Sequence, residues 1–220
     1  PDQSQFTSRF TERAVSFIER NKDRPFFLYV PHVMPHVPIF ASEKFQGKSS
    51  RGLYGDVVEE IDWSIGEIVG AVDRLGLAEN TLVIFNTDNG PFLSYGNHAG
   101  SAGPLREGKL TTYEGGVRTP CIMRWPGRIA PGTTCREVTA TIDLLPTLAK
   151  LLGAPLSGKQ LDGLDVGELI WGAADAKGPR AAFFCYSGDE LQAVRSGPCK
   201  LHMPHDYLTS ASPPGRLASR

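Results

Sequence analysis

The sequence predicts an α/β protein with a mostly parallel sheet flanked by helices, followed by a small antiparallel sheet at its C-terminal end. Residues 26–30 (FFLYV) and 82–85 (LVIF) are continuous apolar runs of strand length, a pattern typical of strands covered on both faces. Between them, apolar residues recur at helical spacing from Val58 to Leu75. A strand, a helix and a strand in this order predict a right-handed crossover, with the two runs as adjacent or near-adjacent inner strands.

The other elements of the main domain follow in chain order. A helix is predicted ahead of the first strand, because apolar residues there recur at helical spacing: Phe6, Phe10, Ala14, Phe17 and Ile18. The second helix is expected to stop near Gly76. Residues 121–125 predict a further strand, which Pro126 and Gly127 end. A last helix is predicted within residues 138–152, with Asp143 as its N-cap.

The C-terminal end of the chain differs in kind. Three short runs, 182–186, 191–195 and 200–203, are separated by turn residues, which predicts an antiparallel meander. We therefore expect residues 1–175 to form the α/β portion and residues 176–220 to form a small antiparallel subdomain. The tail from about Ser210 onward is rich in Ser, Pro and Ala and is expected to be frayed.

Composition excludes several classes of protein. The formal net charge is −1 and there is no basic run, so the sequence carries no nucleic-acid footprint. No apolar stretch approaches the roughly 20 residues that a membrane-spanning helix needs. Pro1 opens the chain without a signal peptide or an initiator Met, so we expect the sequence to be part of a longer protein. The four cysteines, Cys121, Cys135, Cys185 and Cys199, lack metal-site spacing, which leaves free thiols or one disulfide open.

The candidate site lies after the second predicted strand. Asp88 and Asn89 follow residues 82–85 directly, and a carboxylate with an amide oxygen at a strand's carboxyl end suits a hard cation. The loop from Gly90 to Gly116 holds seven glycines and supplies Lys109, and glycine lets backbone approach a ligand closely. His36 leaves the first predicted strand at the same expected sheet edge. Each residue alone also suits a turn or a solvated surface, but together they predict a site.

These residues sit in motifs that resemble the formylglycine-dependent sulfatases, of the arylsulfatase A-like type within the alkaline-phosphatase-like superfamily. The resemblance covers most of the chain and rests on ordered segments: residues 24–27 (RPFF), 35–38 (PHVP), 54–56 (YGD), 87–90 (TDNG), 108–109 (GK), 111–118 (TTYEGGVR) and 142–147 (IDLLPT). The tail, residues 190–195 and 200–202, resembles the small C-terminal sheet of such proteins.

The resemblance implies a role for each candidate residue. Asp88 and Asn89 would ligate Ca²⁺, which would neutralise sulfate oxygens. Lys109 would bind the sulfate as a point charge, and His36 would hydrogen-bond the sulfate or the bridging oxygen. The substrate would be an aryl or carbohydrate sulfate ester. The same resemblance implies a periplasmic or secreted location.

One part of the family pattern has no counterpart in this chain. The nucleophile in the family is a cysteine or serine of a C/S-x-P-S-R segment, oxidised to formylglycine, and no such segment occurs here. The paired aspartates that complete the metal site are missing too. In family order both precede Pro1, so we expect them in a missing N-terminal portion of the same protein, and this chain alone to be inactive as a sulfatase. Leu110 also replaces the glycine that usually follows the lysine.

The sequence leaves two other functions open. Residues 99–103 (AGSAG) are a variant of the nucleophile elbow of serine esterases, which would make Ser101 the nucleophile of a carboxylesterase. An elbow needs a strand directly before the serine and a helix directly after it, and the flanking residues suit neither. The second alternative is a non-catalytic, sulfatase-like remnant, which the absent nucleophile motif keeps open.

Overall fold

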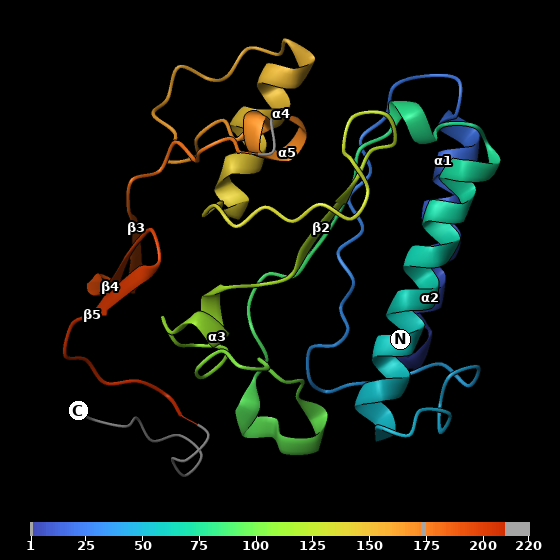
Figure 1. Ribbon diagram of the computed structural model, residues 1–220. Helices are drawn as coiled ribbons and strands as arrows, with labels where there is room; N and C mark the ends of the chain where they lie inside the picture. The colour runs from blue at the N-terminus through green and yellow to red at the C-terminus, as the bar shows by residue number, and fades with distance from the viewer. Residues whose placement is uncertain (1, 173–174, 210–220) are drawn as a thin grey trace.

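The computed structural model of the protein describes residues 2–172 and 175–209. Its N-terminal part is a helical hairpin, in which α1 (Phe6–Asn21) follows the short 3-10 helix η1 (Gln3–Gln5) and packs along α2 (Gly52–Arg74) (Figure 1). Both predicted helices are confirmed. The contact between them is partly polar, because Thr11 Oγ1 donates a hydrogen bond of 2.6 Å to Ser64 Oγ and both residues are buried.

A buried carboxylate holds the loop that leads into α2. Asp56 is 2% exposed and accepts hydrogen bonds from the backbone N–H groups of Ser49, Gly47 and Lys48. These bonds, that from Ser49 first, lower the pKa of Asp56 below its usual value. Because the carboxylate satisfies three backbone donors, the YGD motif has a structural role here.

The first predicted strand is wrong within the described chain. Residues 25–30 are extended but pair with no strand of the described residues, and Phe27 and Tyr29 are 79% and 74% exposed. The opposite face packs on α1, where the rings of Phe26 and Phe17 meet edge to face at 5.8 Å. An extended segment becomes a strand only when a neighbouring backbone takes up its hydrogen bonds, and no described segment does so.

The second predicted strand is confirmed, but its pairing differs from the expectation. β1 (Val83–Asn86) follows the 3-10 helix η2 (Ala78–Asn80) and pairs antiparallel with β2 (Cys121–Arg124), with Val83 opposite Arg124 and Asn86 opposite Cys121. The two strands run side by side through the middle of the molecule (Figure 1). Both sheets of the described residues are antiparallel, so the mostly parallel pairing that we predicted is absent from this part of the chain.

Two short helices follow β2. α4 (Leu144–Leu152) comes after the 3-10 turn η4 (Thr141–Asp143), ends at Gly153 in the left-handed region and precedes α5 (Gly167–Trp171). Asp143 occupies the predicted N-cap position of α4, but its side chain makes no capping hydrogen bond to that helix. Its buried carboxylate accepts instead from the N–H groups of Ala140 and Leu164 and pairs with Arg180. Asp143 thereby ties three separate segments together.

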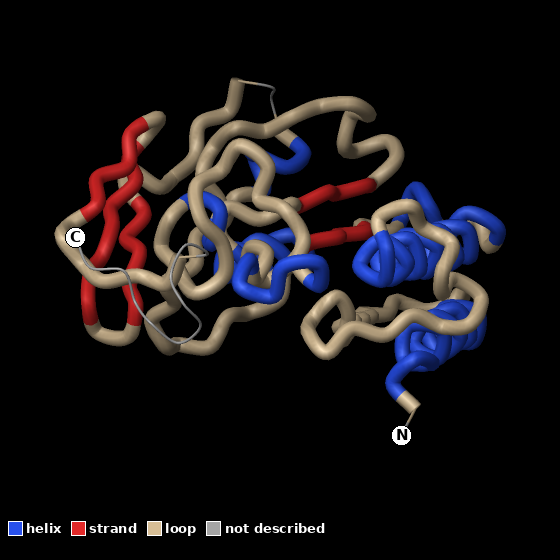
Figure 2. The backbone as a smooth tube through the Cα atoms, turned by 90° about the horizontal axis from the view of Figure 1, so that it is seen from below, coloured by secondary structure: helices blue, strands red, loops and turns tan. Residues whose placement is uncertain are grey.

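The predicted C-terminal meander is confirmed. β3 (Phe183–Ser187), β4 (Glu190–Ser196) and β5 (Cys199–His202) form an antiparallel sheet in sequence order at one end of the molecule (Figure 2). The two-residue turn Gly188-Asp189 joins β3 to β4, with Gly188 at a φ of 58°. The domain boundary near residue 175 stays a prediction. The expectation for residues 210–220 lies outside the described residues.

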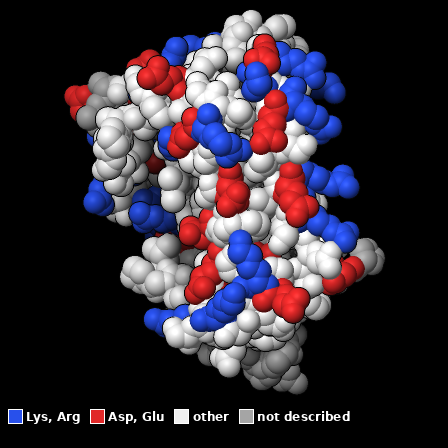
Figure 3. All heavy atoms as spheres, turned by 90° about the vertical axis from the view of Figure 1, so that its right-hand side faces the viewer, with Lys and Arg blue, Asp and Glu red and all other residues white. Residues whose placement is uncertain are grey.

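The structure has a buried apolar core and a surface of mixed charge. A buried cluster of Met34, Ile39, Ala41 and Val57 joins the loop after residue 30 to α2. Lys, Arg, Asp and Glu side chains are interspersed over the face formed by α1 and α2 (Figure 3).

All four cysteines are free thiols, and only Cys185 among them is buried. Among the described helices, none is long and apolar enough to cross a membrane.

Candidate functional site

The turn after β1 presents Asp88 and Asn89. Asp88 is exposed and Asn89 is half-buried, and the Asn89 amide donates a hydrogen bond to Asp88 Oδ1. Thr87 Oγ1 donates to the carbonyl oxygen of Asn89 at 3.4 Å. The two side chains therefore lie together at the carboxyl end of the strand, as predicted from their place in the sequence.

Glycines let the two loops of the site pack backbone against backbone. The N–H of Gly90 donates to the carbonyl oxygen of Gly116 at 2.9 Å, and a Cβ on Gly90 would overlap the carbonyl oxygen of Gly115. A Cβ on Gly108 would overlap the carbonyl oxygen of Pro91. We predicted that such glycines let backbone approach a ligand. At these positions they instead let the chain approach itself.

Lys109 is held beside this turn by its backbone. Its N–H donates to the carbonyl oxygen of Pro91 at 2.8 Å, two residues beyond Asn89. The side chain is half-buried, with Nζ 5.8 Å from the centre of the Phe92 ring. Among the described residues no carboxylate pairs with Lys109, so its charge is available to an anion.

Leu110 occupies a backbone conformation that favours glycine. Its φ is 70° and its side chain is 65% exposed. A left-handed conformation costs a non-glycine residue roughly 1–2 kcal/mol. Leu110 therefore carries this cost at a position where a glycine would not.

His36 is exposed on the loop after residue 30. Its Nδ1 lies 2.7 Å from the carbonyl oxygen of Val37 and donates to it, since a carbonyl oxygen only accepts. No hydrogen bond or ion pair of the described residues links His36 to Asp88, Asn89 or Lys109. The structure thus brings Lys109 to the Asp88-Asn89 turn but shows no contact that adds His36 to them.

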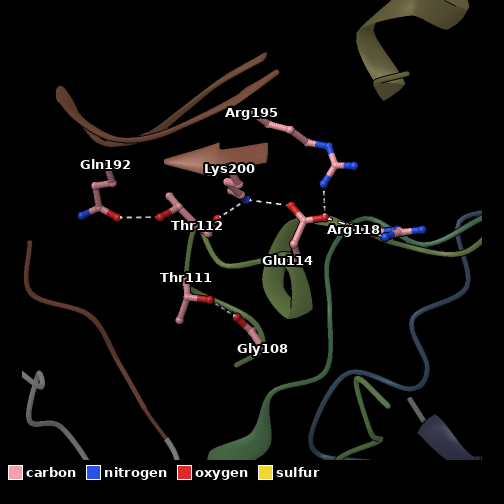
Figure 4. A network of polar contacts seen from close by, with 8 residues as sticks. All are labelled: Gly108, Thr111, Thr112, Glu114, Arg118, Gln192, Arg195 and Lys200. Atoms are coloured by element: carbon pink, nitrogen blue, oxygen red, sulfur yellow. Dashed lines mark hydrogen bonds and ion pairs between the residues drawn. The ribbon is translucent and has the colours of Figure 1, made fainter. Parts of the chain in front are cut away.

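An ionic network that was missed in the sequence joins the site loop to the C-terminal sheet (Figure 4). Glu114, the first residue of α3 (Glu114–Val117), accepts from Arg195 at 2.8 Å and from Lys200 at 2.9 Å. Arg195 and Lys200 are opposite partners in β4 and β5. Two like charges directly opposite one another in a sheet are unfavourable unless a carboxylate neutralises them. The pairing of Arg195 with Lys200 was therefore the signal from which a carboxylate partner could have been expected.

An aromatic cluster strengthens the same junction. The rings of Tyr113 and His202 stack at 4.2 Å, Tyr207 meets Tyr113 at 4.9 Å, and the Arg106 guanidinium lies 4.2 Å from the centre of the Tyr113 ring. Burial first, and then the charges of Lys200, His205 and Arg106, hold the pKa of His202 below its usual value. The lowered pKa favours the uncharged imidazole of His202, which adds no positive charge beside Arg106 and Lys200.

The donors at the turn fit part of a calcium site. Asp88 supplies carboxylate oxygens that no Lys or Arg of the described residues pairs with, and the Asn89 amide lies within hydrogen-bonding distance of them. Because N and O of an amide are interchangeable by rotation, Asn89 can present its oxygen beside the carboxylate. Calcium takes 6 to 8 oxygen ligands, so these two side chains make up part of a set. Within residues 2–172 and 175–209, no group of three or more His, Cys, Asp or Glu gathers around one point.

Ser101 does not have the geometry of a nucleophile elbow. It lies in an irregular, exposed loop after the 3-10 segment η3 (Leu93–His98), with no strand directly before it and no helix directly after it. Its Oγ accepts from the N–H of Gly103 at 3.0 Å. The described residues place no histidine in hydrogen-bonding contact with Ser101, so the structure does not favour the carboxylesterase.

Comparison with known proteins agrees with this arrangement. The family model described as sulfatase matches residues 2–154. Arylsulfatase A of Homo sapiens is 47% identical over 188 residues, which are 83% of this chain and 36% of that protein. N-acetylgalactosamine-6-sulfatase of Canis lupus familiaris is 42% identical over 204 residues, which are 91% of this chain and 38% of that protein.

Solved structures give the same result. The crystal structure of a sulfatase from Pseudoalteromonas sp. superposes with a TM-score of 0.84 at 30% identity, covering 92% of this chain and 41% of that one. This likeness confirms the predicted alkaline-phosphatase-like α/β class. The chain spans well under half the length of these relatives. On the family match and these identities, the chain belongs to the sulfatase family.

Proposed function

We propose that this chain is the C-terminal portion of a sulfatase that hydrolyses sulfate esters. The observation that supports the proposal is the backbone hydrogen bond from Lys109 to Pro91, which ties a lysine without an ion pair among the described residues to the loop just after the Asp88-Asn89 turn. A positive charge near oxygen donors for a cation is an arrangement that binds a sulfate group. The geometry around Ser101 does not favour the carboxylesterase. The non-catalytic remnant, which the absent nucleophile motif leaves open, predicts no turnover and no calcium binding in the two tests below.

Each residue then has a distinct task in our proposal. Asp88 and Asn89 contribute oxygen ligands to Ca²⁺, which when bound would polarise the sulfate oxygens. Lys109 holds the sulfate through charge-assisted hydrogen bonds from Nζ. With Nδ1 donating to Val37, His36 in its doubly protonated form has an Nε2–H that can hydrogen-bond the ester oxygen and pass its proton to the departing alkoxide or phenoxide, which leaves a neutral imidazole.

The formylglycine nucleophile and the other calcium ligands are proposed to lie in an N-terminal portion of the same protein. Exposed apolar side chains support this assignment. Phe27, Tyr29 and Ile122 are 79%, 74% and 64% exposed, although they belong to an extended segment and a strand. Such side chains are ordinarily covered in a folded α/β domain. Our proposal is that the N-terminal portion covers this surface and supplies the missing strand partners.

The first test is turnover. The full-length protein should release inorganic sulfate from sulfate esters such as 4-nitrophenyl sulfate and sugar sulfates, because it holds the complete site. The 220-residue chain alone should release essentially none, since no residue in it can become formylglycine. Ion chromatography of released sulfate is the measurement. Robust turnover by the purified chain alone would contradict the proposed division of the site.

The second test is calcium binding. Asp88→Ala in the full-length protein should abolish calcium binding, because the substitution removes a charged ligand from a site that needs several. Isothermal titration calorimetry with CaCl₂ measures the affinity. Asp62→Ala is the matched control, since Asp62 is an exposed residue of α2 without an ion pair among the described residues. Equal calcium affinity in Asp88→Ala and wild type would refute the metal assignment.

A further inference from the structure

An open cavity lies directly beside the proposed sulfate site. Its volume is about 340 Å³, and it is lined by the loop residue after Lys109 and by the C-terminal sheet and the segment that follows it: Leu110, Ser187, Glu190, Gln192, Asp206, Tyr207 and Leu208. Leu208 also borders a small adjoining hollow that Lys109 lines. Leu110, the neighbour of Lys109, and the shared Leu208 thus place this cavity next to the loop that carries Lys109.

The position of Glu190 in the cavity is fixed through the site loop. Gln192 is 5% exposed, and its amide nitrogen donates to Glu190 Oε2 at 2.7 Å. The amide oxygen of Gln192 accepts from Thr112 Oγ1 at 3.2 Å, a contact drawn in Figure 4. Thr112 is three residues beyond Lys109, so a buried side chain connects the sulfate loop to a carboxylate in the cavity.

The cavity lining is polar and negatively charged. Within the part of the chain that the structure describes, neither Glu190 nor Asp206 has an ion-pair partner. Of the nearby cations, Arg195 and Lys200 are both paired with Glu114, and Arg106, which is not among the lining residues, binds the Tyr207 hydroxyl. The carboxylates accept hydrogen bonds from hydroxyl groups and repel further anionic groups. The Tyr207 hydroxyl accepts from Arg106 at 3.0 Å, so the aromatic wall of the cavity is held as well.

We propose that this cavity receives the alcohol part of the sulfate ester and selects a carbohydrate without further anionic groups, with Glu190 as a specificity residue that accepts hydroxyl hydrogen bonds. This inference rests on the proposed sulfatase function and names its substrate class. A second sulfate on the sugar that came into contact with Glu190 or Asp206 would be repelled by the carboxylate. A flat aryl group would leave the polar lining without hydrogen-bond partners.

The test compares three kinds of ester with the full-length protein. These are galactose monosulfates carrying the ester at each hydroxyl in turn, the galactose disulfates, and 4-nitrophenyl sulfate. We expect the highest kcat/KM for one of the monosulfates. Glu190→Gln keeps the acceptor for Gln192 and removes only the charge. It should lower kcat/KM for that monosulfate about tenfold and raise it for the disulfates, because a charged acceptor is lost and repulsion is relieved.

Asp189→Asn is the matched control. It removes the same charge one residue away, in the turn between β3 and β4 and outside the cavity lining, and should leave the preference among esters as in wild type. A wild-type preference for disulfates or for 4-nitrophenyl sulfate would overturn the inference while leaving the sulfatase proposal intact. So would a Glu190→Gln protein whose kcat/KM changes equally for all esters or for none. Release of sulfate from none of the esters would overturn both proposals.

Discussion

Lys109→Ala should lower kcat/KM for sulfate esters by at least about 100-fold in the full-length protein, because it removes the charge-assisted contact to the sulfate. The loss should be specific, since the backbone N–H that bonds to Pro91 is unchanged by the substitution. His36→Ala should cause a loss of similar size, about 100-fold, through the hydrogen bond to the leaving oxygen. Initial rates of sulfate release at several substrate concentrations measure both effects.

Lys159→Ala controls for loss of a lysine, because Lys159 is exposed and has no ion pair among the described residues. Its kcat/KM should equal that of wild type. For His36, the cost should be smaller with an ester whose leaving group is very acidic, because such a group departs without a proton. A Lys109→Ala protein with wild-type kcat/KM would remove the central element of the proposed site.

Gly90→Ala should destabilise the site loops by roughly 3 kcal/mol, the upper end of the usual cost of overpacking. The added methyl would overlap the carbonyl oxygen of Gly115, and backbone on both sides prevents either group from moving aside. The hydrogen bond from Gly90 to Gly116 would be lost with this packing. We therefore expect a lower Tm and weaker calcium binding together, measured by differential scanning fluorimetry and calorimetry.

Gly66→Ala in the same protein should raise the stability of the fold, whereas Gly90→Ala should lower it. Gly66 lies inside α2 with open space around its Cα, so alanine should stabilise the helix by about 0.5–1 kcal/mol. A Gly90→Ala protein with the Tm and calcium affinity of wild type would show that the two loops do not pack as described.

Several features were determined by the sequence alone. The periodicity of α1 and α2, the short runs of the C-terminal meander and the strand ahead of Asp88 were all predicted correctly in kind. The place of Asp88 and Asn89 after that strand was also predicted, because a strand and the turn that ends it are local in the chain. Local signals such as helical spacing and turn residues decide these features without reference to distant segments.

Other features of the site depended on tertiary contacts. The salt bridges of Glu114 with Arg195 and Lys200 join residues more than 80 positions apart, and the Asp143 side chain binds backbone N–H groups outside its own helix. Neither role could be predicted from neighbouring residues, since the sequence around a carboxylate does not show whether its side chain faces solvent or a cation. The same holds for Gln192, which connects Thr112 to Glu190 only because β4 packs beside the site loop.

Strand pairing separates what the sequence predicts from what only the tertiary structure shows. Residues 26–30 and β1 have the same apolar character, yet β1 pairs antiparallel with β2 while residues 26–30 pair with no described strand. Composition and periodicity predicted that both segments are extended and that their apolar side chains should be buried. Which backbone lies beside β1, in which direction, and that Phe27 and Tyr29 are exposed in the described chain were decided only by the tertiary structure, because hydrogen bonding between strands and burial are set by segments distant in the chain.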